Sequence, residues 1–195
     1  MKLGQTPSQT VGPFFAYGLT PEQYLYDFRS AFKPVLVRED TPGTHIEITG
    51  QVIDGAGNPV SDAMVEIAHA DADGKFVTSL ADIDKTGFTG FGRCGTGTDA
   101  QNRFAFRTIK PGACAQGEAP YVNVIVTMRG MLVHAFTRIY FGDEAAANAN
   151  DPVLASVPAE RRDTLIAKRE GREGQIVYRF DIRMQGDAET VFFDL

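Results

Sequence analysis

The three histidines are the first residues in this sequence that could carry metal chemistry. His45, His69 and His134 each fall in a different stretch with strand character. A metal site made from them would require three separate strands to converge on one ion, which their spacing does not indicate. We therefore interpret them as surface histidines, or as strand histidines whose ring nitrogens are satisfied by hydrogen bonds.

An acidic run and a glycine-rich run are the next candidates for ligand binding. The run His69-Ala-Asp-Ala-Asp-Gly looks like the start of an EF-hand calcium loop, but the position of the bidentate glutamate is Leu80. No helical pattern flanks it, so a turn that ends a strand is the better interpretation. The glycines within residues 90–97 accompany no phosphate-binding or nucleophile motif, and they predict a compact loop.

The two cysteines, Cys94 and Cys114, are too few for a disulfide framework and do not form a CxxC pair. We interpret both as ordinary thiols.

Arg129 is a candidate for recognising a carboxylate. In the predicted strand 121–129, strict alternation places it on the same face as Tyr121 and Asn123. A guanidinium can hold a carboxylate through two parallel hydrogen bonds. On spacing alone, an ordinary surface arginine remains the alternative.

The composition narrows the class of protein. The chain has 195 residues, of which 43% are hydrophobic, so it can bury one sizeable core, and we expect a single domain over residues 1–195. The net charge of -6 argues against a nucleic-acid partner, which requires clustered basic residues. The first residues lack the apolar run of a secretory signal, and no apolar stretch is long enough for a membrane span, so we expect a cytoplasmic protein.

The elements that must position these residues are mainly strands. Residues 1–43 are rich in proline, glycine and aromatic residues and predict an extended N-terminal arm that packs on the body or on a partner. Residues 44–195 predict a core with at least seven strands, a long loop over 75–100, and one or two short helices confined to 143–170. We expect an antiparallel two-sheet β-sandwich. The strand candidates are residues 44–53, 60–70, 102–109, 121–129, 132–141, 176–184 and 190–195.

Several strings together resemble the intradiol aromatic-ring dioxygenases, and the resemblance covers nearly the whole chain. The last two strings are similar to the alpha-type chains of those family members that act on 3,4-dihydroxybenzoate. The strings are TPSQTVGPFF at 6–15, GQVIDGAGNPV at 50–60, GFGR at 90–93, FRTIKPG at 106–112, TRIYFGDEAAANANDPVL at 137–154 and YRFDIRMQGDAETVFFDL at 178–195.

The resemblance implies that this chain does not bind iron. Catalytic chains of the family hold non-heme Fe(III) with two tyrosinates and two histidines. The matching positions here are Leu80, Cys114, Tyr121 and Asn123, so all four ligands are replaced. The resemblance therefore implies an alpha-type subunit with no catalytic residue of its own, which needs an iron-bearing beta-type partner in an alpha–beta hetero-oligomer.

The resemblance also implies a substrate pocket close to the boundary between the two chains. There the oxygenase would open the ring of 3,4-dihydroxybenzoate with O2 to give 3-carboxy-cis,cis-muconate, and this chain would supply substrate-binding residues. Phe14 stands where similar chains commonly have a tyrosine. The residues carried over are Thr10, Gly12, Pro13, Phe14 and Arg129.

Two other functions remain open at this point. The chain could be a stand-alone β-sandwich module that binds aromatic acids without a partner. It could also be a purely structural subunit in which Arg129 is an ordinary interface salt-bridge former.

Overall fold

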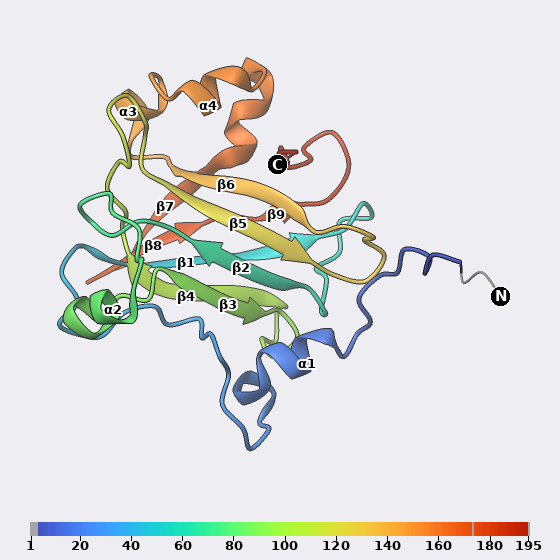
Figure 1. Ribbon diagram of the computed structural model, residues 1–195. Helices are drawn as coiled ribbons and strands as arrows, with labels where there is room; N and C mark the ends of the chain where they lie inside the picture. The colour runs from blue at the N-terminus through green and yellow to red at the C-terminus, as the bar shows by residue number, and fades with distance from the viewer. Residues whose placement is uncertain (1–3, 173, 195) are drawn as a thin grey trace.

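The computed structural model describes residues 4–172 and 174–194, and a single curved sheet dominates it (Figure 1). The prediction of a mainly β protein is confirmed. The strands are β1 (His45–Ile53), β2 (Met64–Ala68), β3 (Phe91–Gly95), β4 (Arg103–Ile109), β5 (Tyr121–Thr127), β6 (Ala135–Phe141), β7 (Ile166–Arg172), β8 (Gln175–Arg179) and β9 (Ile182–Arg183).

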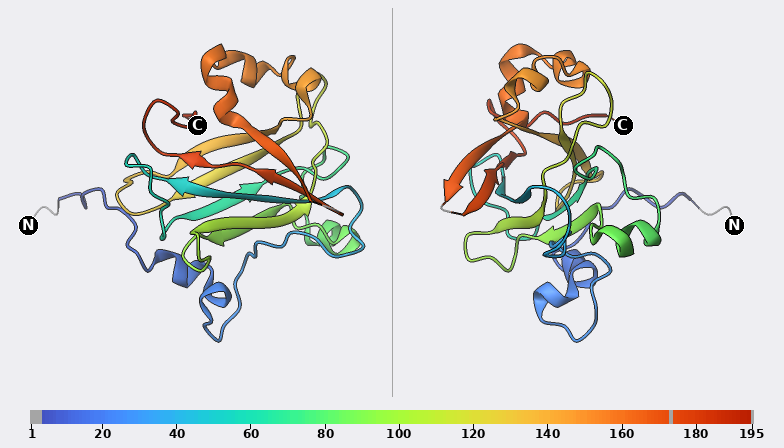
Figure 2. Two further views of the ribbon diagram at one scale, coloured as in Figure 1. Left: turned by 180° about the vertical axis from the view of Figure 1, so that it is seen from behind. Right: turned by 90° about the vertical axis from the view of Figure 1, so that its left-hand side faces the viewer.

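The sheet is continuous and mixed, which corrects the prediction of two antiparallel sheets. Its strand order is β3-β2-β5-β6-β7-β8-β1-β4, with β9 also paired to β1. The pairs β6–β7, β1–β8 and β1–β9 are parallel, and Figure 2 shows β1 and β8 side by side from behind. Parallel neighbours need a long crossover connection, and the helical segment between β6 and β7 supplies one.

The core lies inside the curve of the sheet and follows from the alternation of the strands. In β5, Val122, Val124 and Val126 are fully buried, while Asn123 and Ile125 on the other face are only partly buried. The same period places Ile46 and Ile48 of β1 in this core. Alternate burial of branched side chains is what a strand with one face on a core requires. The predicted alternation is confirmed over residues 122–127.

Residues 33–36, which we call the closing segment, connect the two edge strands of the sheet. On the β4 side, Leu36 N–H donates to the Arg107 carbonyl at 2.8 Å, and Arg107 N–H donates to the Pro34 carbonyl at 2.9 Å. On the β3 side, Arg93 N–H donates to the Lys33 carbonyl at 3.3 Å, and Thr89 N–H donates to the Leu36 carbonyl at 2.9 Å. The segment therefore satisfies backbone groups that both edges would otherwise expose.

The rest of the arm is more ordered than the sequence predicts. Two short helices interrupt it, α1 (Phe15–Leu19) and the 3-10 helix η1 (Pro21–Tyr24). The side chain of Gln23 donates to the Gly95 carbonyl at 2.5 Å and accepts from the Gly95 N–H at 2.9 Å, at the end of β3. The expectation that the arm packs on the body is confirmed for this part of it.

The loop predicted over 75–100 contains two elements that sequence patterns missed. Helix α2 (Leu80–Thr86) begins at Ser79, whose hydroxyl accepts from the Asp82 N–H, and ends at Gly87 in the left-handed conformation. Strand β3 follows and was missed because glycines break its alternation. A Cβ at Gly92 would collide with the buried Leu36 side chain, so glycine is required there for the closing segment to dock.

The second half of the chain holds the helices where they were expected. They are α3 (Ala145–Asn148), α4 (Pro152–Ser156) and the 3-10 helix η2 (Ala159–Leu165). The expectation of a helix continuing to residue 170 was wrong, because β7 begins at Ile166 and pairs with both β6 and β8. Of the strand predicted over 190–195, the described residues 190–194 form only a bridge between Phe193 and Phe136, and Leu195 lies outside the described residues. No helix in the described residues is both long and apolar enough to span a bilayer.

The histidines behave as interpreted from the sequence. His45 and His134 are exposed, whereas His69 is fully buried. The His69 ring bonds the Thr108 hydroxyl and the Ala70 carbonyl, both at 2.8 Å. Burial lowers the pKa of His69 from 6.5 to about 4, so the ring stays neutral in the folded protein.

Buried His69 predicts an acid-sensitive fold. As the pH falls from 6.5 to about 4, His69 is protonated in the unfolded chain but stays neutral in the folded chain. The free energy of unfolding therefore falls. The loss over this window is about 3 kcal/mol. Urea unfolding measured between about pH 7 and about pH 4 should show this slope, and His69→Gln should flatten it. The same slope in both proteins would contradict the assignment.

Candidate functional site

The N-terminal arm contacts the turn that follows β5, and this turn contains Arg129. The Thr10 hydroxyl accepts a hydrogen bond from the Gly130 N–H at 2.9 Å. Gly12 and Pro13 then turn the chain into α1, with the Phe15 N–H donating to the Gly12 carbonyl at 3.1 Å. Thr10 and the Arg129 turn therefore meet, although they are far apart in sequence.

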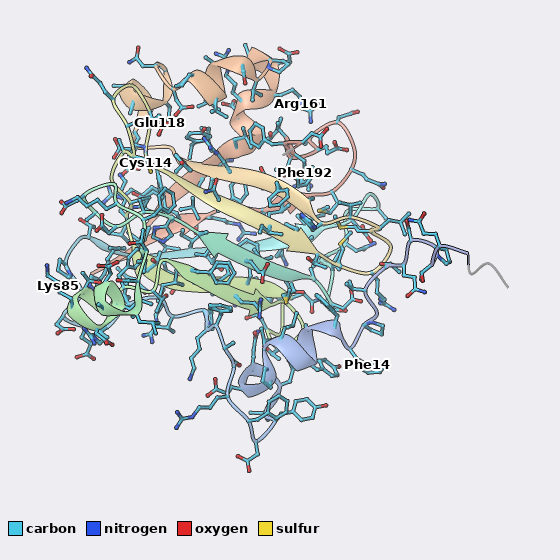
Figure 3. The ribbon with its side chains drawn as sticks, viewed as in Figure 1. Phe14, Lys85, Cys114, Glu118, Arg161 and Phe192 are labelled. Atoms are coloured by element: carbon cyan, nitrogen blue, oxygen red, sulfur yellow. The ribbon has the colours of Figure 1, made fainter. Side chains whose placement is uncertain are left out.

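Phe14 is available on the surface rather than packed into the body. Its side chain is 70% exposed, and its ring meets only the edge of Tyr17 at a centroid distance of 5.4 Å among the described aromatic pairs. Figure 3 places Phe14 beside α1, on the opposite side of the molecule from Cys114. Most of the Phe14 side chain is therefore open to solvent.

Arg129 lies in the turn just beyond the end of β5, so its predicted place on the strand face with Tyr121 and Asn123 was wrong. Its Nε forms an ion pair with Asp62, whose side chain is only 13% exposed, while the Arg129 side chain remains 59% exposed. A cavity of about 230 Å³ adjoins the turn and is lined by Met128, Met131, Met184 and Gln185 among others. The guanidinium is thus anchored on one side and open on the other.

The four positions that match the family's iron ligands do not form one cluster of donors. Leu80 is 80% exposed on the first turn of α2. Tyr121 is buried, and Cys114 lies beside its hydroxyl. Asn123 is two residues further along the same face of β5. It lines a cavity whose lining includes neither Tyr121 nor Cys114. The structure therefore brings Cys114 and Tyr121 together and leaves Leu80 apart.

These residues do not fit a ferric ion. Leu80 has no donor atom, and burial, followed by the hydrogen bond with Cys114, raises the pKa of the Tyr121 hydroxyl, which disfavours the phenolate that Fe(III) needs. The Arg138 guanidinium also stacks on the Tyr121 ring, 3.9 Å from its centroid, and would repel a cation. Across residues 4–172 and 174–194, no group of three or more histidine, cysteine or acidic side chains is placed to hold a metal.

A buried polar network that the sequence analysis missed stands next to Tyr121. The Tyr140 hydroxyl donates to Asp151 at 3.0 Å, and the same carboxylate accepts from the N–H groups of Ala119 at 3.0 Å and Leu154 at 2.8 Å. Burial is the main reason that the pKa of Tyr140 rises to about 12. The sequence signal that pointed to this network was the alternation in residues 137–141, which places Arg138 and Tyr140 on the face opposite the core.

Comparison with known proteins identifies the family. A family model described as dioxygenase matches residues 29–186. The protocatechuate 3,4-dioxygenase alpha chain of Burkholderia cepacia is 61% identical over 99% of this chain and 98% of its own length. The beta chain of that enzyme from the same organism is 35% identical over 76% of this chain and 67% of its own length. The chain belongs to the intradiol dioxygenase family.

The fold agrees with this membership. A solved intradiol ring-cleavage dioxygenase from Tetranychus urticae superposes with a TM-score of 0.59 at 15% identity, covering 81% of this chain and 89% of that chain. At this identity the likeness concerns the fold alone. The mixed sheet is therefore the framework that this chain shares with that structure.

The contact between Thr10 and Gly130 predicts how firmly the arm is held. Thr10→Val keeps the shape of the side chain but removes the acceptor, which costs about 1 kcal/mol. The arm should then open about fivefold more often, and chymotrypsin should cleave after Phe14 or Phe15 correspondingly faster under native conditions. Thr6→Val is the matched control, and equal cleavage rates for the two variants would show that this hydrogen bond does not hold the arm.

Proposed function

We propose that this chain is the alpha subunit of a protocatechuate 3,4-dioxygenase. In that assembly a beta subunit carries the non-heme Fe(III), and the enzyme cleaves 3,4-dihydroxybenzoate. Both atoms of O2 enter the product while the bond between the two hydroxyl-bearing carbons breaks, which gives 3-carboxy-cis,cis-muconate. The single observation that carries this proposal is the 61% identity to an alpha chain over almost the full length of both chains.

The replaced ligand positions support the proposal that the partner chain, and not this chain, holds the iron. Leu80, Cys114, Tyr121 and Asn123 offer no ferric site, so the metal chemistry belongs to the partner in this proposal. The role left to this chain is to shape the substrate pocket and its electrostatics. We also propose that residues 1–195 act as one domain, with the arm over 1–43, and that the protein is cytoplasmic.

A partner surface near the arm is supported by exposed apolar side chains. Phe14 is 70% exposed, and Leu132 and Val133, in the connection between β5 and β6, are 64% and 70% exposed. In this same region Thr10 accepts a hydrogen bond from the N–H of Gly130, the residue next to Arg129. Exposed apolar side chains beside a charged group are typical of a surface that another chain covers.

Arg129 is proposed to recognise the carboxylate of the substrate. The ion pair with Asp62 holds one side of the guanidinium, and its exposed side can present two donors to a planar carboxylate. Thr10, Gly12, Pro13 and Phe14 are proposed to close the pocket from the arm. Catechol lacks this carboxylate, so the arginine would distinguish the two compounds.

A purely structural role is the second candidate, and one observation favours it. Arg129 already has a carboxylate partner in Asp62. An arginine that is neutralised within its own chain can hold a turn in place without touching any substrate.

The first experiment tests the need for a partner. Iron content and 3,4-dihydroxybenzoate-dependent oxygen uptake are measured for this chain alone, for the beta-type chain alone, and for the two after co-expression. We expect this chain alone to hold no stoichiometric iron and to show no ring cleavage, because its donor set does not suit Fe(III). Stoichiometric iron in the lone chain would contradict the proposal.

A second experiment separates recognition from structure at Arg129. In the co-purified complex, Arg129→Ala should lower kcat/KM for 3,4-dihydroxybenzoate roughly tenfold to a hundredfold, mainly through KM, because a charge-assisted hydrogen bond is lost. Arg129→Lys should fall between. Arg38→Ala is the matched control, because Arg38 is 52% exposed and also pairs with a carboxylate, that of Asp40. An intact complex with unchanged KM would favour the structural role.

A further inference from the structure

Three methionines line the cavity beside the turn that follows β5. The chain contains five methionines, and Met128, Met131 and Met184 share the lining of this one cavity of about 230 Å³. We call these three residues the methionine cluster. Of the other two, Met64 is 3% exposed and belongs to the core, and Met1 lies outside the described residues. Most of the methionines therefore meet at one place, beside the turn that the arm contacts.

The methionine cluster can be reached from solvent, whereas Met64 is shielded. Each of the three residues is partly exposed, and Met128 and Met184 also pack against the hydrophobic core. The cavity beside them is large enough to admit a small neutral molecule such as hydrogen peroxide. These thioethers are therefore held by packing and are still open to a reagent from outside.

Hydrogen peroxide is a reagent whose chemistry matches this cluster. The thioether sulfur attacks one peroxide oxygen with its lone pair, so that an S–O bond forms and the O–O bond breaks. The departing oxygen takes the proton of the transferred oxygen and leaves as water. The sulfur loses two electrons and the peroxide gains them. The product is methionine sulfoxide, which is polar and chiral where the thioether was apolar.

The methionine cluster flanks the group that holds the arm. Met128 and Met131 lie on either side of Arg129 and Gly130, and the Met131 N–H donates to the Met128 carbonyl at 3.4 Å, which closes the turn. The Gly130 N–H donates to the Thr10 hydroxyl at 2.9 Å. The side chains that pack this turn and the N–H that holds the arm are therefore close neighbours in the chain.

The third thioether comes from another part of the sheet. Met184 directly follows β9, and its N–H donates to the Ile53 carbonyl of β1 at 2.9 Å, so its backbone is fixed to the sheet. Arg129 and Gly130 in the turn are exposed instead. When the cavity lining changes in size or polarity, the exposed turn gives way more easily than the hydrogen-bonded sheet.

We propose that the methionine cluster is an oxidation site for hydrogen peroxide, and that its oxidation releases the N-terminal arm from the turn. A sulfoxide oxygen that packs against the core side of the cavity loses its hydrogen bonds to water, which costs free energy. The turn therefore moves outward until these oxygens reach solvent, and the Gly130 N–H leaves the Thr10 hydroxyl. The inference requires no iron, substrate or partner chain, and it stands apart from the proposed role in ring cleavage.

Oxidation under native conditions tests the site. The full chain is treated with about 10 mM hydrogen peroxide, and peptide mass spectrometry follows the gain of one oxygen at each methionine. We expect the initial rate at each member of the cluster to be at least about tenfold higher than at Met64, because a buried thioether reacts only during local opening. Oxidation of Met64 as fast as the cluster would overturn the proposal.

Proteolysis tests the consequence for the arm. Chymotrypsin cleavage after Phe14 or Phe15 should be about fivefold faster in the oxidised chain than in the untreated chain, because the arm opens more often. Peroxide should add little to the cleavage rate of Thr10→Val, since the same contact is already lost in that variant. An unchanged rate in a chain whose cluster is fully oxidised would reject the release of the arm.

Leucine variants locate the effect. The triple variant Met128→Leu, Met131→Leu, Met184→Leu keeps the apolar volume of the cluster but forms no sulfoxide there. Its cleavage rate should be the same before and after peroxide. Met64→Leu is the matched control and should respond to peroxide as the unmodified chain does. A full peroxide response in the triple variant would assign the effect to other residues and reject the site.

Two further measurements keep the test decisive. Methionine sulfoxide reductases with their thiol reductant should restore slow cleavage, whereas the thiol alone should not, which separates the cluster from oxidised Cys94 or Cys114. Recovery with the thiol alone would place the effect at a cysteine and contradict the proposal. Thermal unfolding identifies a triple variant that fails to fold, and Met131→Leu, a single change in the turn, should then reduce the peroxide response.

Discussion

The backbone hydrogen bonds of the closing segment are the constraint on which the rest of the structure depends. In the described residues, the strand order of the curved sheet begins at β3 and ends at β4, and both of these end strands carry backbone groups that need partners. Residues 33–36 bond to both edges and insert Leu36, which is fully buried, into the core. This fixes where the arm leaves the body, and therefore where α1 and the residues before it can reach.

The surroundings of Tyr121 show why this face of the sheet does not suit a ferric ion. Arg138 stacks on the Tyr121 ring, and burial together with Cys114 raises the pKa of the Tyr121 hydroxyl. Next to it, the buried Asp151 carboxylate accepts from Tyr140 and also caps α4, so it holds the helical segment on the sheet. A positive charge and structural hydrogen bonds therefore surround Tyr121.

The sequence predicted the elements whose patterns are strong and local. Alternation located β1, β4, β5 and β6, and it assigned the core face of β5 correctly, because one buried face imposes a period of two. Strand β3 was missed because Gly92 is selected by contact with Leu36, a residue distant in sequence. The parallel pairs were missed because β6 and β7 are joined by a helical crossover and β1 pairs with β8 and β9, which are distant in sequence, so no local pattern gives their direction.

Some residues of the candidate site were predicted from the sequence, but their contacts were not. The strings resembling the family led to Thr10 and Arg129, which the structure brings to one turn. The partnership between Arg129 and Asp62 could not be anticipated, since no local pattern connects residues on separate segments. Arg138 was also missed, because a charged residue in an alternating strand indicates only an outward face, and its stacking on Tyr121 depends on the register of β5 and β6.

The parallel pairing of β1 has a consequence for synthesis of the chain. Strand β1 spans His45–Ile53, yet two of its partners, β8 and β9, lie at Gln175–Arg179 and Ile182–Arg183. A nascent chain on the ribosome can pair β1 with β4 early, but the opposite edge of β1 stays open until residues 175–183 have emerged. During that interval a strand rich in isoleucine and valine is exposed to other nascent chains. Translation speed and chaperone supply therefore bear directly on the yield of folded protein.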